Sequence, residues 1–114
     1  MIKDKLNISK ETQEKIQEIQ GLEQNLNYLL MQKQAFQSEF SETENALTEI
    51  KNSKEDVFKI IGQIMIKADR KKTEADLTKK SELLNLRLSS IEKQEKELIN
   101  ELEALRQEII KEMK

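Results

Sequence analysis

The chain has 114 residues, enough for one domain, but 36% are hydrophobic and 37% charged, which excludes a large globular core. Histidine and cysteine are both absent, so the commonest general base, the commonest metal ligand, disulfides and thiolate chemistry are excluded. The net charge is −2 with acids and bases interspersed. We therefore expect no enzyme activity, no cofactor or metal, and neither nucleic acid nor membrane as a partner. Without an apolar span or signal peptide, the prediction is a soluble, cytoplasmic protein.

The first predicted element is a helix over about residues 9–53. Proline is absent, and abundant Glu, Lys, Leu and Gln favour long helices. From Ile19 to Ile50, positions follow each other in alternating steps of three and four, and eight of these ten are apolar. Such sustained heptads with charged flanks are typical of a coiled coil, which buries only a narrow seam.

The second predicted element is a β-hairpin over about residues 56–69. In "VFKIIGQIMIK" five β-branched residues surround Gly62, and Gly62 with Gln63 can form a two-residue turn. Alternation would place Phe58, Ile60, Ile64 and Ile66 on one face, and Val57, Ile61 and Met65 on the other. The alternative is that this run continues the helices around one long bend.

A hairpin with apolar groups on both sides and two open edges is marginal in water, so it needs neighbours. We expect it to join several copies, or related chains, into a sheet or barrel. The predicted oligomerisation residues are Val57, Phe58, Ile60, Ile61, Gly62, Ile64, Met65 and Ile66.

The last predicted element is a second helix over about residues 72–114, where eight of ten seam positions from Leu77 to Ile109 are apolar. If the chain folds back antiparallel, the numbers of facing seam residues add up to 124, as for Leu47 with Leu77 and Ile19 with Leu105. The fold-back point is then Gly62, in agreement with the turn. The expected fold is mainly α: a long antiparallel two-helix coiled coil with one central β-hairpin, forming a single domain over residues 1–114.

Polar residues interrupt this seam at matching places. Thr43 faces Ser81, while Lys33 and Glu95 fall in adjacent layers. We hypothesise that Lys33 and Glu95 reach each other and set the register; the alternative is that both extend to water. Near the turn, four glutamates of residues 39–49 oppose the basic cluster of Arg70, Lys71, Lys72, Lys79 and Lys80, which supports the fold-back. Glu74 and Asp76 interrupt this cluster, which favours a solvated or intramolecular role over contact with RNA.

Three segments resemble prefoldin, specifically its β-type subunit: "LNYLLMQKQAFQSEFSETENALTEI", "EDVFKIIGQIMIKAD" and "LLNLRLSSIEKQEKEL". An archaeal β subunit fits better than a eukaryotic paralogue, because the chain is compact. The resemblance implies a hetero-hexamer of two α-type and four β-type subunits whose hairpins form a β-barrel. It also implies an ATP-independent holdase that captures unfolded proteins and passes them to a group II chaperonin.

The resemblance further implies that clients bind at the distal tips of the helices. There Lys15 opposes Ile109 and Thr12 opposes Glu112, so the apolar seam breaks down. Exposed apolar groups on a mobile tip can accept many unfolded partners. The predicted client-binding residues are Leu6, Ile8, Ile16, Ile109, Ile110 and Met113. The alternative is that these residues close the last turns of the coil, and the rival function is a structural tether or adaptor without chaperone activity.

Overall fold

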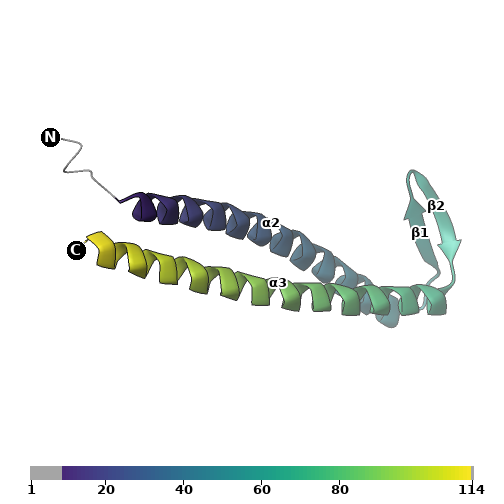
Figure 1. The fold of residues 1–114 in the computed structure, drawn as a ribbon. Helices are drawn as coiled ribbons and strands as arrows, with labels where there is room; N and C mark the ends of the chain where they lie inside the picture. The colour runs from purple at the N-terminus through teal and green to yellow at the C-terminus, as the bar shows by residue number, and fades with distance from the viewer. Residues whose placement is uncertain (1–8, 114) are drawn as a thin grey trace. The chain divides into compact units, whose positions relative to one another are not determined.

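The computed structural model describes residues 9–113, in which two long helices flank one hairpin (Figure 1). The elements are α2 (Lys10–Asn52), β1 (Val57–Ile61), β2 (Ile64–Ala68) and α3 (Arg70–Met113). The predicted helices and central hairpin are confirmed, and the alternative of one helical bend is wrong.

Both helices begin at a capping side chain. The Ser9 hydroxyl oxygen accepts a hydrogen bond from the Thr12 backbone amide at 3.1 Å, so α2 starts one residue later, at Lys10. An Asp69 carboxylate oxygen accepts one from the Lys71 amide at 3.0 Å. This cap explains why α3 begins at Arg70 rather than near residue 72, because the cap satisfies an amide that has no partner within the helix.

The hairpin register corrects the predicted faces. Val57 pairs with Ala68 and Ile61 with Ile64, so Gly62 and Gln63 form the turn. Residues that pair across the two strands lie on the same face of the hairpin, so Ile60 shares a face with Met65 and not with Ile64. A two-residue turn pairs odd-numbered residues with even-numbered ones, and the predicted alternation ignored this exchange. One face holds Phe58, Ile60, Met65 and Lys67; the other holds Val57, Lys59, Ile61, Ile64, Ile66 and Ala68.

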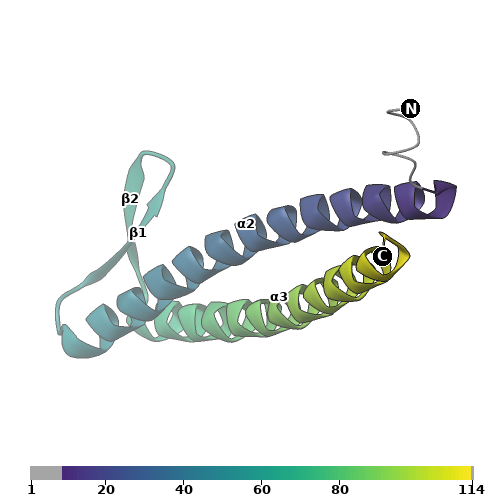
Figure 2. The ribbon, with the colours of Figure 1, turned by 90° about the vertical axis from the view of Figure 1, so that its left-hand side faces the viewer.

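The chain divides into two compact units. The terminal unit comprises residues 1–32 and 91–114, and the hairpin unit comprises residues 33–90. Within each unit a stretch of α2 runs antiparallel to a stretch of α3, and the two lie side by side in both ribbon views (Figures 1 and 2). The hairpin connects the two helices within its own unit.

Each unit has a narrow core along the predicted seam. All ten predicted seam positions on each helix are buried or half-buried. In the terminal unit Leu29, Ile91 and Leu102 are buried, and in the hairpin unit Leu47 and Leu84 are. Removal of these side chains from water is the main term that holds the helices together.

Two ion pairs, one beside the seam in each unit, confirm the antiparallel register. Glu23 lies 3.2 Å from Arg106 in the terminal unit, and Glu39 lies 3.2 Å from Lys80 in the hairpin unit. Their residue numbers add up to 129 and 119, five above and five below the value of 124 for the seam. This offset is expected for residues on opposite sides of an antiparallel seam.

The predicted polar layer of Thr43 and Ser81 is buried, at 3% and 8% exposed. The Thr43 hydroxyl donates to the backbone carbonyl of Glu39, and the Ser81 hydroxyl donates to the Glu44 carboxylate. Lys33 and Glu95 belong to different units, so their pairing stays a prediction. Between residues 9 and 113, neither helix has a stretch apolar enough to cross a membrane.

Candidate functional site

The hairpin presents its apolar side chains to solvent. Phe58 is 52% exposed and Ile60 is 72% exposed, although both are large and apolar. Of the other predicted oligomerisation residues, Ile61, Gly62, Ile64, Met65 and Ile66 are exposed, and Val57 is half-buried. The two strands pair only with each other in the described part of the chain, so each has an open edge. A two-stranded sheet of this kind gains stability only by packing against something else.

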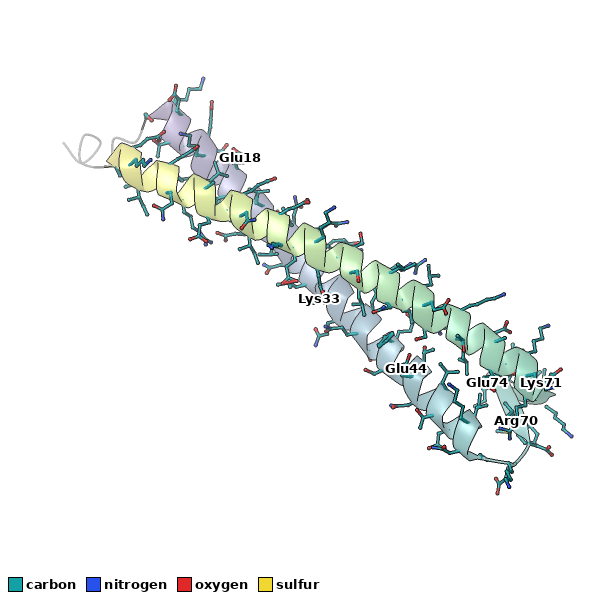
Figure 3. The ribbon with its side chains drawn as sticks, turned by 90° about the horizontal axis from the view of Figure 1, so that it is seen from below. Glu18, Lys33, Glu44, Arg70, Lys71 and Glu74 are labelled. Carbon is teal, nitrogen blue, oxygen red and sulfur yellow. The ribbon has the colours of Figure 1, made fainter. Side chains whose placement is uncertain are left out.

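Charged groups anchor the base of the hairpin. The Arg70 guanidinium, labelled at the start of α3 in Figure 3, donates to the backbone carbonyls of Ile50 and Glu55. These bonds tie the start of α3 to the last turn of α2 and to the loop before β1. Lys59 of β1 lies 3.9 Å from Asp76 of α3. The hairpin is therefore attached to the helices at its base while its apolar strands stay exposed.

A polar cluster joins the first turns of α2 to the last turns of α3. The Thr12 hydroxyl and the Lys15 ammonium both donate to the Glu112 carboxylate, and Lys15 lies 3.5 Å from Glu108. Thr12 is only 2% exposed. The hydrogen bond to Glu112 raises the pKa of Lys15, and the bonds from Lys15 and then Thr12 lower the pKa of Glu112. At these ends of the two helices, polar side chains therefore take the place of the apolar seam residues.

One flank of the terminal unit, on the side of the Glu23–Arg106 pair, carries apolar residues, most of them exposed. Ile16 and Leu30 lie one heptad before and after Glu23. Ile99 and Met113 lie one heptad before and after Arg106. Seven residues are close to two helical turns, so each set shares one side of its helix. A groove runs along this side, lined by Glu23, Leu26, Asn27, Ile99, Leu102, Glu103 and Arg106.

We call Ile16, Leu30, Ile99, Ile110 and Met113 the apolar flank, because Ile110 follows Glu103 of the same groove by one heptad. Ile110 is 48% exposed and Met113 is 64% exposed, whereas Ile16 is half-buried. Three of the predicted client-binding residues are therefore brought to one side. Ile109 instead lies half-buried in the seam, and Leu6 and Ile8 fall outside the described residues.

The opposite flank of the terminal unit is acidic. Its groove is lined by Asn25, Tyr28, Leu29, Gln32, Gln94, Glu97, Leu98 and Glu101. The heptad positions of this side hold six exposed glutamates together with Lys111. We call these glutamates the acidic flank: Glu11, Glu14, Glu18, Glu97, Glu101 and Glu108. Glu18 is labelled in Figure 3. The two sides of this unit therefore differ strongly in polarity.

Leu30 and Ile99 were missed by the prediction from sequence, which looked for client-binding residues only near the chain ends. Both are more than a third exposed, at 40% and 43%. The heptad register contained the signal, because apolar residues beside the seam are unusual where charged flanks are expected.

Comparisons with known proteins agree with this architecture. The family model described as "Prefoldin subunit" matches residues 13–114. The chain is 35% identical to the prefoldin subunit beta of Thermococcus onnurineus over 105 residues, covering 90% of each chain. It is 33% identical to the prefoldin subunit beta of Saccharolobus islandicus, covering 87% of this chain and 80% of that protein.

A solved structure has the same fold. The crystal structure of the prefoldin beta subunit from Thermococcus strain KS-1 superposes with a TM-score of 0.82 at 33% identity. The superposition covers 90% of this chain and 91% of the other.

Proposed function

Because this chain belongs to the prefoldin family and is of its β type, we propose that it is an ATP-independent holdase subunit acting in the cytoplasm. In this proposal it captures unfolded proteins through the terminal unit and passes them to a group II chaperonin. The proposal includes no catalytic step and no cofactor. It assigns the two exposed parts of the chain to separate tasks, assembly for the hairpin and client binding for the apolar flank.

The observation that carries the proposal is the exposed hairpin. Both of its faces present large apolar side chains, and both of its edges are open in the described part of the chain. Hairpins of several subunits can pair edge to edge, which satisfies the free backbone groups and buries one apolar face of each hairpin inside a barrel. We propose a hetero-hexamer of two α-type subunits and four copies of this chain.

Native mass spectrometry of the complex, purified gently from its own cells, tests the assembly. The expected mass corresponds to four copies of this chain and two of a second, related subunit. A lone monomer or homodimer would instead favour the structural tether, in which the hairpin only connects two helices.

An aggregation assay tests the chaperone activity of that complex. We expect it to slow the aggregation of a chemically denatured protein without ATP, and to release that protein on addition of a group II chaperonin. Light scattering follows the first step and recovery of the native client follows the second. A complex of the expected mass without any effect on aggregation would refute the holdase role while leaving the assembly intact.

A further inference from the structure

The terminal unit is strongly acidic, unlike the rest of the chain. Its described residues, 9–32 and 91–113, carry eleven glutamates against six lysines and arginines, a net charge of −5, although the whole chain carries only −2. Counting residues 1–8 and 114 as well, the sequence of this unit still carries −3. Such a field attracts positively charged segments and repels negative ones.

The acidic and apolar groups of this unit lie on different sides. The apolar flank runs from Met113 and Ile16 to Ile99 and Leu30, and the 14 residues from Ile16 to Leu30 correspond to about 21 Å of helix. That length accommodates about six residues of an extended peptide. The acidic flank lies across the seam, close enough for its charge to act on a peptide without contact.

An ion pair divides the apolar flank. Glu23 and Arg106 are 3.2 Å apart, but their side chains are 49% and 57% exposed. Exposed pairs of this kind are weak, so a lysine or arginine of an incoming segment can replace Arg106 as the partner of Glu23. Glu103 adds a second carboxylate to the same groove. The flank thus offers apolar contacts at both ends and, between them, two carboxylates against the one guanidinium of Arg106.

From this arrangement we infer that the apolar flank selects client segments in which lysine or arginine lies between apolar residues. This inference rests on the proposed holdase function and adds the chemical class of the client. The apolar side chains supply the contact area, and the charge of the unit supplies the preference among segments of equal hydrophobicity.

Two fluorescent peptides with identical apolar residues, one with four lysines and one with four glutamates, test the inference on the assembled complex. Fluorescence anisotropy should show the lysine peptide binding about tenfold more tightly at low salt. The preference should shrink toward equality in about 0.5 M salt, because salt screens charges separated by more than a few ångströms. Equal binding at low salt, or tighter binding of the glutamate peptide, overturns the inference.

Matched substitutions locate the binding side. Leu30→Gln with Ile99→Gln should weaken binding of the lysine peptide about tenfold, because two exposed apolar contacts are lost. Tyr28→Gln is the control, since Tyr28 is 64% exposed but lines the acidic groove of the same unit. An equal loss in both variants, or none in the double variant, contradicts the assignment. Native mass spectrometry of each variant checks that the complex still forms.

A second pair of substitutions keeps the charge preference testable even if the apolar double variant does not assemble. Glu18→Lys with Glu101→Lys changes two exposed residues of the acidic flank and leaves the apolar flank unaltered. The preference for the lysine peptide should fall severalfold, and an unchanged preference contradicts the inference.

A wild-type complex that slows client aggregation without any charge preference overturns this inference alone, whereas one that neither binds peptide nor slows aggregation overturns the proposed function.

Discussion

Thr43 and Thr73 are both buried on the hairpin unit, yet their hydroxyl groups differ in what they contact. The Thr43 hydroxyl donates to the Glu39 backbone carbonyl at 2.8 Å. The Thr73 hydroxyl, in a residue only 7% exposed, has no hydrogen-bond partner among the described residues. A buried hydroxyl without a partner costs free energy, whereas a hydrogen-bonded one contributes about 0.5–1.5 kcal/mol to stability.

Thr73→Val should therefore leave the free energy of unfolding unchanged or raise it by about 1 kcal/mol, since valine keeps the shape and removes the hydroxyl. Thr43→Val is the matched control and should lower it, because a bonded donor is lost. Thermal unfolding of the assembled complex, followed by circular dichroism, compares the two variants. A larger loss for Thr73→Val than for Thr43→Val would contradict this difference.

The Thr12–Lys15–Glu112 cluster makes the helix ends sensitive to extreme pH. The pKa of Glu112 is lowered from its ordinary value of 4.5, so its contribution is present above that pH and is lost as the pH falls through the lowered pKa. The pKa of Lys15 is raised from 10.5, so its contribution is present below that pH and is lost as the pH rises through the raised pKa.

Titration of the Glu112 carboxyl carbon by NMR should give a midpoint below 4.5, and the Thr12 amide signal should shift over the same pH range. Lys15→Gln should raise that midpoint, because the hydrogen bond from Lys15 is the largest cause of the lowered pKa. A midpoint that does not change in this variant would show that the cluster does not form in solution.

At the scale of the element, the hairpin turn depends on one glycine. Gly62 has φ of 60°, and no other described residue has positive φ. A two-residue hairpin turn with positive φ at its first position alone is of type II′, which favours glycine there. Apart from the neighbours of Gly62 in the chain, no described residue has an atom within 4 Å of the place where a Cβ would stand, so the strain of a substitution comes from the backbone and not from crowding.

Gly62→Val should therefore destabilise the turn by about 1–2 kcal/mol, whereas Gly62→Asn should cost less, because asparagine tolerates left-handed backbone. The hairpin is the proposed assembly element, so the valine variant should also lower the fraction of chain found in the complex. Native mass spectrometry of both variants at equal concentration measures this fraction. Equal assembly of the two would argue against a type II′ turn.

At the scale of the molecule, the proposal separates assembly from client binding. Ile109→Ser with Ile110→Ser changes the last turns of α3, far along the chain from the hairpin. Ile110 is 48% exposed on the apolar flank, while Ile109 is half-buried in the seam. We expect the complex to form normally and its suppression of client aggregation to weaken severalfold, because apolar contact area is lost.

Ile110→Ser alone separates the two sites, since it leaves the seam intact. If only the double variant loses activity, the terminal apolar residues act by closing the coil, which was the alternative prediction. Loss of the complex in the double variant, seen by native mass spectrometry, would likewise contradict the separation of tasks.

The sequence by itself determined the helices, the hairpin and the antiparallel register. Heptads and a central glycine are local or periodic signals, and the register that centres the fold-back on Gly62 places every seam position, such as the buried Leu47 and Leu84, between the helices. The family likewise followed from the order of these elements together with short matching segments.

Only the tertiary structure decided which residues beside the seam share a side. The cross-strand pairs exchanged Ile64 and Ile66 with Met65 between the hairpin faces, because a turn of two residues changes the parity of facing positions. Contacts between helices likewise placed Glu23 with Arg106, and so brought Leu30 and Ile99 onto the flank of Ile110. Such neighbours are distant in sequence, and their proximity exists only once the two helices pack against each other.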